Sequence, residues 1–203
     1  MQKICSIICG APCERLPLDE IKGTVIAADR GLDYCLRDGV VPDIVIGDFD
    51  SAECAPPVGA ECIRFAPEKD FTDAYLAAET AAERGAAELR FFAALGGRLD
   101  HTFANFQMAY GLHCRGISAY LYGENERAYL LSGRREVARF DGYLSVFAFG
   151  GSAVVSEEGT KYPAQRCELR ESFPLGVSNE ITAERAVITV HSGTALIIEH
   201  RRR

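Results

Sequence analysis

Basic residues are scarce in this 203-residue chain: 22 Lys and Arg stand against 29 Asp and Glu, a formal net charge of −7. A general nucleic-acid binder needs a broad basic face, so that function class is excluded, and the basic residues 201–203 are interpreted as a solvated end. No apolar run reaches the length of a membrane span. The apolar stretch near the N-terminus, about six residues, is too short for a secretory signal. We expect a cytoplasmic protein that binds neither nucleic acid nor membranes.

The eight cysteines lack the spacing of a metal site. Cys5, Cys9 and Cys13 are four residues apart, which matches neither a CxxC zinc pair nor the usual iron–sulfur patterns. The remaining cysteines are scattered, so reduced thiols are expected. The chain also lacks a GxxxxGK[ST] segment, which excludes a P-loop ATPase.

The first two-thirds of the chain alternates short apolar runs with helix-like segments. Several runs are continuous rather than alternating, which is typical of parallel strands buried on both faces. Strands are predicted at 3–9, 24–28, 44–47, 62–65, 88–94 and 117–122, and helices at 31–37, 72–83 and about 102–113. This alternation predicts an α/β domain with a doubly wound, mostly parallel sheet over residues 1–125.

The last third has a different character, with frequent turn signals and no convincing helix. Ser192-Gly193 lies between two apolar runs and predicts a hairpin that joins 186–191 to 194–199. The other expected strands are 137–140, 143–149, 153–156 and 165–168. Close-spaced short strands of this kind predict an all-β domain, a small β-sandwich or barrel, over residues 126–203.

Four acidic clusters follow apolar runs of the first domain. They are Asp29 in AADRG, Asp48 and Asp50 in IVIGDFDSA, Asp70 and Asp73 in PEKDFTD, and Asp100 in GGRLDH. Open α/β sheets bind ligands outside the carboxyl ends of their strands, so these acids are expected to converge there. Two carboxylates about 5 Å apart repel each other by roughly 3 kcal/mol at a dielectric near 20. A magnesium ion would remove this repulsion, and the interleaved Arg30, Lys69 and Arg98 suit an anionic partner such as phosphate.

Each motif also has a structural alternative. Asp48 and Asp50, two residues apart, project together from a strand end, but Asp50 or Ser51 could instead cap a following segment. Asp70 and Asp73 have the spacing of a capping box. Asp100 could be the N-cap of the helix after the Gly96-Gly97 turn, and His101 alone is interpreted as a structural residue.

Taken together, the motifs resemble the thiamine pyrophosphokinase family. The matching segments are AADRG, PDIVIGDFDS, EKDFTDA, ALGGRLDHTFAN and FPLGVSNE. The resemblance implies transfer of a pyrophosphoryl group from ATP to thiamine by a homodimer with active sites between subunits. It also implies an α/β catalytic domain followed by a β-sandwich domain that binds thiamine, in agreement with the two domains predicted above.

The resemblance also implies roles for individual residues. The magnesium and catalytic acids would be Asp48, Asp50, Asp70, Asp73 and Asp100, and the ATP contacts would be Asp29, Arg30, Lys69, Thr72, Gly97 and Arg98. Ser178 and Asn179 match a motif of the thiamine pocket, although such a pair could equally form an Asx-type turn. Some family members stack a Trp on the substrate ring, and this chain has none. Either another aromatic side chain takes that place or the pocket is less aromatic.

Two other functions compete with this interpretation. A metal-dependent phosphohydrolase could use the same aspartates to direct water at a phosphate ester. A non-catalytic nucleotide-binding module would explain the glycines and basic residues but not so many acids. The β-rich second half with its Ser178-Asn179 pair favours the transferase, since a hydrolase does not need it.

Overall fold

The computed structural model describes residues 3–47, 55–64 and 71–202. Contacts between its Cα atoms divide the chain into two units, Met1–Glu124 and Asn125–Arg203. No helix within the described ranges is long and apolar enough to cross a lipid bilayer.

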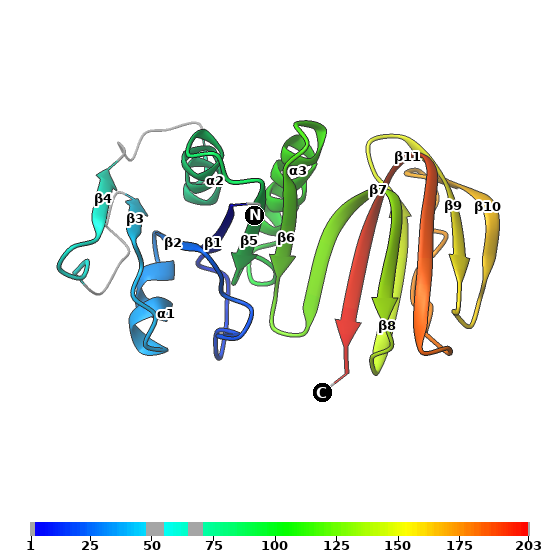
Figure 1. The fold of residues 1–203 in the computed structure, drawn as a ribbon, viewed down its shortest axis with the longest axis horizontal. Helices are drawn as coiled ribbons and strands as arrows, with labels where there is room; N and C mark the ends of the chain where they lie inside the picture. The colour runs from blue at the N-terminus through cyan, green and yellow to red at the C-terminus, as the bar shows by residue number, and fades with distance from the viewer. Residues whose placement is uncertain (1–2, 48–54, 65–70, 203) are drawn as a thin grey trace. The chain divides into compact units, whose positions relative to one another are not determined.

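The first unit is built on a parallel sheet (Figure 1). Every pairing among its described strands is parallel, and the strands lie in the order β6-β5-β1-β2-β3-β4. Their bounds are β1 Ile4–Ile8, β2 Thr24–Ala28, β3 Ile44–Gly47, β4 Glu61–Arg64, β5 Glu88–Phe92 and β6 Ser118–Tyr122. The continuous apolar runs are the central strands, and β1, β2 and β3 are almost fully buried, as such runs predict.

The order of the strands reverses direction beside β1. The chain proceeds from β1 through β2 and β3 to β4 on one side, and then continues on the other side with β5 and β6. The connection that follows β1 leads to β2 on one side, and the connection that follows β5 leads to β6 on the other side. The two connections therefore leave these neighbouring strands in opposite directions. In open α/β sheets the crevice outside the carboxyl ends of two such strands is where ligands bind.

Three helices connect these strands: α1 Gly31–Arg37, α2 Asp73–Glu83 and α3 Leu99–Cys114. Thr72 is the N-cap of α2, and its Oγ1 accepts a hydrogen bond of 3.2 Å from the N–H of Tyr75. Asp73 is therefore the first helical residue and not the reciprocal member of a capping box, so that alternative is wrong for Asp73. Asp70, the other residue of that pair, lies outside the described ranges. The N-cap of α3 is Arg98, so the alternative of Asp100 as its N-cap is also wrong.

One face of the sheet packs against α1. A buried apolar cluster there combines Leu32, Tyr34 and Cys35 of the helix with Ile8, Val25, Ala27, Val45 and Phe92 of the strands. Gly31, the first residue of α1, makes this close packing possible. A Cβ atom added to it would lie 2.0 Å from the carbonyl oxygen of Ile8.

Replacing Gly31 with Ala is expected to destabilise the protein by about 3 kcal/mol, because α1 would have to move away from the rigid backbone of β1. The matched control is Gly111→Ala in α3, where an added Cβ meets nothing within 4 Å. There alanine should stabilise the helix by about 0.5–1 kcal/mol. Denaturant unfolding followed by circular dichroism measures both changes. Equal free energies of unfolding for the two variants would contradict the packing of α1 on β1.

The second unit is antiparallel. Its strands are β7 Glu126–Ala138, β8 Gly142–Ala148, β9 Ser152–Glu158, β10 Ala164–Arg170 and β11 Arg185–Arg201. They pair in the order β10-β9-β11-β7, and β8 pairs with β11 off this path. The described chain is thus a mixed, sheet-rich α/β fold with few helices.

The predicted hairpin at Ser192-Gly193 is wrong. Residues 185–201 form one long strand, β11, that pairs with β7 on both sides of these two residues. The register shifts between Val190 and Ala195, so Ser192-Gly193 forms an irregularity in the strand and not a turn. Gly193 has a φ of 75°, and a Cβ there would lie 2.1 Å from the carbonyl oxygen of Ser152. A glycine that permits a bulge and a glycine that permits a turn look alike in sequence.

Candidate functional site

A pocket of about 430 Å³ opens at the carboxyl ends of the parallel strands. The segments at the ends of β1, β2 and β5 line it, namely residues 9–12, 28–30, 93–94 and 96–98. The start of α2 at 72–74 also lines it, as do His101 and Asn105 of α3. Since β1 and β5 are the strands beside which the chain order reverses, the pocket lies at the position that the topology favours for a ligand.

Many of the predicted site residues meet in this pocket. Those that line it are Asp29, Arg30, Thr72, Asp73, Gly97 and Arg98. Asp100 is not among the lining residues. The predicted residues Asp48, Asp50, Lys69 and Asp70 lie outside the described ranges. Ser178 and Asn179 belong to the second unit.

Two residues that line the pocket adopt a left-handed backbone conformation without being glycine. They are Asp29, with a φ of 49° directly after β2, and Ala93, with a φ of 50° directly after β5. The N–H of Asp29 donates to the carbonyl oxygen of Ile46 at 2.8 Å, which ties this turn to β3. Such conformations cost about 1–3 kcal/mol each and concentrate at functional sites, where the surrounding structure enforces them.

Gly97 allows the loop after β5 to approach the loop after β1. Its φ is 68°, and an added Cβ would lie 2.6 Å from Cδ of Pro12. The residue therefore needs glycine both for its conformation and for space. A loop of this kind can bring backbone N–H groups close to an anion.

Arg98 and Asp100 form a bidentate ion pair at the edge of the site. The guanidinium Nε lies 3.1 Å from Oδ1 and Nη2 lies 2.5 Å from Oδ2. This hydrogen bonding to Arg98 lowers the pKa of Asp100 below its usual value, so the carboxylate is ionised near neutral pH. Both side chains are mostly exposed to solvent, where such a pair is weak, so a phosphate group could compete for the guanidinium.

The sequence interpretation missed the loop after β1. Cys9, Gly10, Ala11 and Pro12 all line the pocket, yet none of them is charged and none belongs to an acidic cluster. Their signal was positional: a glycine directly after the first apolar strand. Cys9 is almost fully buried, and burial raises its pKa to about 12, so it is a neutral thiol and not a nucleophile.

Asn105 is a second residue that sequence reasoning missed. It lies on α3 with only 8% of its surface exposed, and its Nδ2 donates to the carbonyl oxygen of Ala94 at 2.7 Å. The side chain thereby fixes the loop after β5 to α3 next to the pocket. The sequence shows only an asparagine inside a predicted helix; its burial, which implies a specific partner, is visible in the structure alone.

The described residues contain no group of three or more His, Cys, Asp or Glu side chains arranged to hold a metal ion. Of the predicted magnesium ligands, only Asp73 and Asp100 are described. Asp73 shares the pocket with Asp29, so two carboxylates line one cavity.

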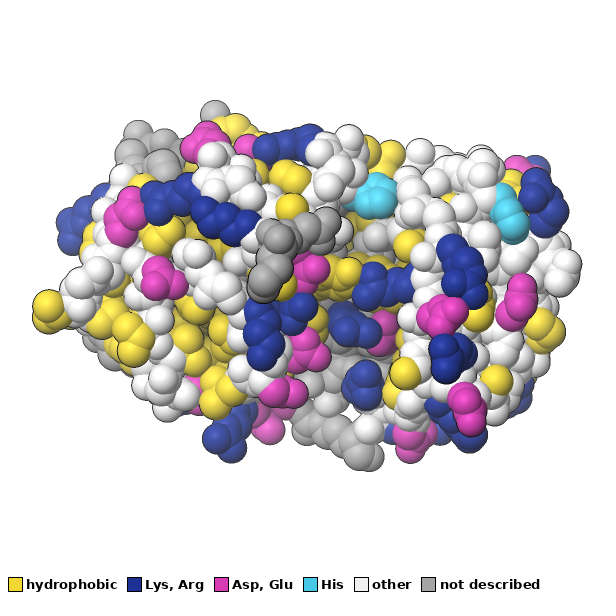
Figure 2. All heavy atoms as spheres, viewed as in Figure 1, with side chains coloured by type: hydrophobic (Ala, Val, Ile, Leu, Met, Phe, Trp, Pro, Cys, Tyr) yellow, Lys and Arg dark blue, Asp and Glu magenta, His cyan; other side chains and the backbone are white. Residues whose placement is uncertain are grey.

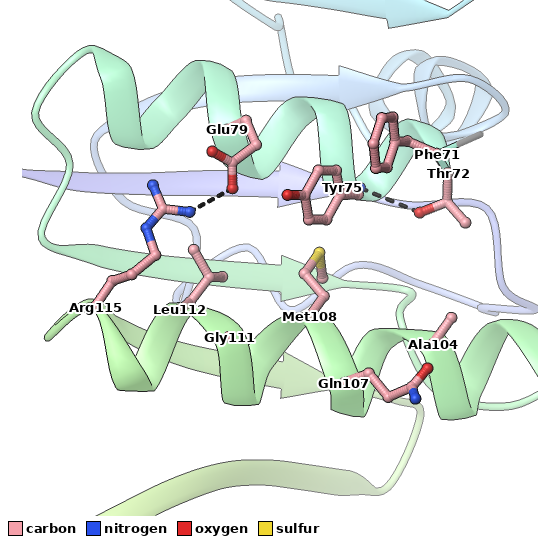
Figure 3. Close-up of a pocket in the computed structure, with 10 residues that line it drawn as sticks. All are labelled: Phe71, Thr72, Tyr75, Glu79, Ala104, Gln107, Met108, Gly111, Leu112 and Arg115. Atoms are coloured by element: carbon pink, nitrogen blue, oxygen red, sulfur yellow. Dashed lines mark hydrogen bonds and ion pairs between the residues drawn. The ribbon is translucent and has the colours of Figure 1, made fainter. Parts of the chain in front are cut away.

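A second cavity, of about 390 Å³, is a groove between α2 and α3 (Figure 3). Phe71 and Tyr75 stack at one side of it with ring centroids 5.0 Å apart. At the other end Arg115 forms an ion pair with Glu79 at 2.5 Å. The lining is largely apolar and its arginine is already paired, so this groove suits a phosphate ligand less well than the pocket at the strand ends.

In the second unit, Ser178 and Asn179 are tied to their neighbours. Ser178 has a left-handed φ of 59°, and its N–H donates to Oγ of Ser145 at 2.9 Å. Asn179 is 5% exposed, and its Oδ1 accepts hydrogen bonds from the N–H groups of Tyr162 and Glu180, each at 3.0 Å. The asparagine side chain thus holds its own segment and that of Tyr162, but its bond within its own segment goes to the next residue, whereas an Asx-type turn uses the residue two positions on.

Comparison with known proteins assigns both units. The model of the thiamin pyrophosphokinase catalytic domain matches residues 20–121, and that of the thiamin pyrophosphokinase vitamin B1 binding domain matches residues 132–197. The chain is 26% identical to the thiamine pyrophosphokinase of Bacillus subtilis (strain 168) over 215 residues, which cover 97% of this chain and 98% of that protein.

Solved structures show the same fold. A crystal structure of thiamine pyrophosphokinase from Bacillus subtilis matches with a TM-score of 0.89 and 25% identity, covering 99% of this chain and 100% of that one. The thiamin pyrophosphokinase of Geobacillus thermodenitrificans matches with a TM-score of 0.83 and 26% identity, over 98% of both chains. None of these matches supports the phosphohydrolase alternative. The chain therefore belongs to the thiamin pyrophosphokinase family, the enzymes that transfer a pyrophosphoryl group from ATP to thiamine.

Proposed function

We propose that the pocket at the carboxyl ends of the parallel strands is where this chain binds ATP and transfers its pyrophosphoryl group to thiamine. The observation that supports this most directly is the convergence of Asp29, Arg30, Thr72, Asp73, Gly97 and Arg98, from separate segments, on that one pocket.

The lining residues suit a polyphosphate. Arg98 offers a planar guanidinium that can bind phosphate oxygens in bidentate fashion, and the loop at Gly97 brings backbone close to the pocket. Thr72 and Asp73 begin α2, and the N-terminus of a helix favours negative charge. Lys69 would add a second cation, while Asp29 and Arg30 would lie on the nucleotide side.

The donor chemistry of the site fits a hard divalent cation. Aspartate carboxylates are the ligands that magnesium prefers, and the proposed set is Asp48, Asp50, Asp70, Asp73 and Asp100. When bound, the ion would neutralise charge on the phosphate oxygens. Arg30 and Arg98 offset the carboxylates of Asp29 and Asp73 in this pocket, and the cation would compensate the further negative charge that the polyphosphate brings.

The reaction is attack by the thiamine hydroxyl oxygen on the β-phosphorus of ATP, with AMP as the leaving group. Positioning and charge neutralisation account for most of the rate enhancement in such transfers. Arg98 and Lys69 would stabilise charge that develops on the transferred group. One carboxylate, Asp70, Asp73 or Asp100, would accept the hydroxyl proton.

The finer architecture is also a proposal. In residues 1–125, the ATP- and magnesium-binding domain, α1 packs on one face of the sheet, while Ile7, Ile26 and Ile46, which alternate with that face, are buried too. A doubly wound sheet explains both observations. In residues 126–203, the thiamine-binding domain, the first part of β11 pairs with β9 and the last part with β8. A strand that exchanges partners in this way supports a β-sandwich.

The proposed partners and location rest on the family resemblance, the surface charges and the cysteines. The family resemblance suggests a homodimer with active sites between subunits. On the face shown in Figure 2, basic and acidic side chains are interspersed, which favours neither nucleic acid nor an anionic membrane surface as a partner. The described cysteines are free thiols, which suits a reducing cytoplasm.

The test is an assay of AMP formation with ATP, magnesium and one of three acceptors: thiamine, thiamine monophosphate or another primary alcohol. We expect AMP and thiamine diphosphate to form in equal amounts. Of the three acceptors, only thiamine should react efficiently. Phosphate release that does not need thiamine would instead indicate a hydrolase. ATP binding without turnover on any acceptor would indicate a binding module.

A further inference from the structure

Ala93 occupies a strained position directly after β5. Its φ of 50° lies in the left-handed region, and the residue lines the pocket at the strand ends with only 4% of its surface exposed. Glycine adopts this conformation without strain, but a residue with a Cβ does not. Such a conformation persists only when the surrounding structure enforces it. The contacts that hold Ala93 therefore help to set the shape of the pocket.

Three hydrogen bonds hold the peptide groups that follow Ala93. Its carbonyl oxygen accepts from the N–H of Ala11 at 2.9 Å, and the N–H of Ala94 donates to the carbonyl oxygen of Tyr122 at 3.0 Å. The carbonyl oxygen of Ala94 accepts from Nδ2 of Asn105 at 2.7 Å. The first two bonds join backbone groups, so Asn105 is the partner that a substitution can remove.

The bond from Asn105 to Ala94 is short and buried. Asn105 is 8% exposed and Ala94 is 1% exposed, and 2.7 Å is at the short end of the range for N–H···O bonds. A buried carbonyl group that loses its donor keeps the full cost of its desolvation. Without Asn105, we therefore expect the carbonyl of Ala94 to turn toward water and Ala93 to leave the left-handed region.

The support for this bond is a packed helix. Asn105 lies in the second turn of the 16-residue helix α3, and Met108, Ala109 and Leu112 of the same helix are buried as well. A side chain on a packed helix holds its partner more precisely than a side chain on a loop does. Asn105 can therefore fix the position of the segment that follows β5.

The segment after Ala94 contains the groups proposed to bind phosphate. Gly96 and Gly97 line the pocket, and no residue within the described ranges accepts a hydrogen bond from either N–H group. Gly97 also lies so close to the loop after β1 that an added Cβ would be 2.6 Å from Cδ of Pro12. Arg98 follows as the N-cap of α3. A shift at Ala94 would thus displace both N–H donors and the guanidinium group.

We propose that Asn105 is a positioning residue for phosphate binding: it holds the carbonyl of Ala94, keeps Ala93 left-handed, and thereby sets the loop with Gly97 and Arg98 against the pocket. This rests on the proposed function, because it assumes that ATP binds in this pocket. Asn105 acts through the loop and is not assigned a contact with the substrate. The ligand whose binding depends on Asn105 is therefore the polyphosphate of ATP and not thiamine.

The first test compares Asn105→Leu and Asn105→Ala with the unmodified protein in the AMP assay. Leu keeps the approximate size of the side chain, Ala avoids crowding, and neither can donate to Ala94. Loss of this buried hydrogen bond should raise the KM for ATP about tenfold in both variants. The KM for thiamine should stay within about twofold, since the loop is proposed to bind phosphate only. The Kd for ATP, measured by calorimetry with magnesium and without thiamine, should rise by the same factor as its KM.

The comparison of the two KM values separates positioning from stability. A variant that is only less stable has fewer active molecules, which lowers kcat and the melting temperature but leaves the KM for ATP unchanged. That result in both Asn105 variants would overturn the inference, and so would equal rises in the two KM values. The matched control is Gln107→Leu, which removes an exposed carboxamide from the same helix and should change neither KM.

The second test asks whether Asn105 acts through the strain at Ala93. Ala93→Gly removes the Cβ that makes the left-handed conformation costly, so the loop then needs less enforcement. Relative to Ala93→Gly alone, the double variant with Asn105→Leu should have an ATP KM raised only about two- to threefold, because residues coupled through a backbone shift are not additive. A full tenfold rise in the glycine background would contradict a path through Ala93.

The outcomes distinguish this inference from the proposed function. Unmodified protein that neither binds ATP with magnesium nor forms AMP from ATP and thiamine would remove both. Normal AMP formation by the unmodified protein, together with an unchanged ATP Kd in Asn105→Leu and Asn105→Ala, would remove the inference alone.

Discussion

Removing divalent metal with EDTA should reduce thiamine-dependent AMP formation to background, and adding magnesium in excess of EDTA should restore it. The reason is electrostatic. The pocket contains the carboxylates of Asp29 and Asp73 on its described surface, and ATP adds several further negative charges. Arg30 and Arg98 line the same pocket and offset these two carboxylates, so the charge of the polyphosphate is left for a cation to compensate, and magnesium prefers oxygen ligands of this kind.

Two controls make this result specific. Raising ionic strength with potassium chloride to match the added magnesium should not restore activity, since a monovalent salt only screens the charges. The melting temperature should change little with EDTA, because the fold has its own apolar cores in both units. Full activity in EDTA would remove the proposed magnesium site, even though the family assignment would stand.

The α/β unit could be read from the sequence with good accuracy. The strands Thr24–Ala28 and Ile44–Gly47 and the helix Gly31–Arg37 have the bounds that the patterns predicted. Buried parallel strands appear as short continuous apolar runs, and the polar loops between them mark where each run ends. The largest shift in this unit is the start of α3 at Leu99, where 102 was expected. The first turn of α3 directly follows the Gly96-Gly97 turn, so its residues were assigned to the loop.

The β unit was predicted less well. Its longest strands, β7 and β11, contain Ser132-Gly133 and Ser192-Gly193, which were read as breaks or left out. The register of β7 against β11 shifts between the pair Val190–Gly133 and the pair Ala195–Leu131, so both Ser-Gly pairs lie at one irregularity within a continuous ladder. Whether a Ser-Gly pair turns the chain or is absorbed in a bulge depends on the partner strand, which local sequence does not specify.

In the candidate site too, some residues could be predicted from the sequence and others could not. Charged residues after strands, such as Asp29 and Arg98, were found because their chemistry is visible in the sequence. Cys9 to Pro12 were missed because they contribute backbone and shape at the position where the strand order reverses, and strand order is a property of the assembled sheet. The role of Asn179 was undecided for a similar reason: its partners Glu157 and Tyr162 are about 20 residues away in the sequence.

Replacing Asp73 with Asn should lower kcat by about 10²–10³-fold, the range observed when one preorganised charged or polar contact to a reacting group is lost. Asp73 is the first residue of α2 and lines the pocket together with Thr72 and Arg98. Asn keeps the size of the side chain but removes the negative charge, so it can neither bind magnesium well nor accept the hydroxyl proton. Steady-state AMP formation at several magnesium concentrations measures the change.

Stability cannot account for a loss of that size. A carboxylate in the first turn of a helix stabilises it by about 0.3–1 kcal/mol, so the variant should melt only slightly below the unmodified protein. A thousandfold loss of kcat corresponds to about 4 kcal/mol in the transition state. The matched control is Glu83→Gln, which removes an exposed carboxylate from the other end of the same helix and should leave kcat unchanged. If Asp73→Asn kept near-normal kcat, the Asp73 carboxylate would only stabilise the N-terminus of α2. The catalytic acids would then have to be sought among the other aspartates.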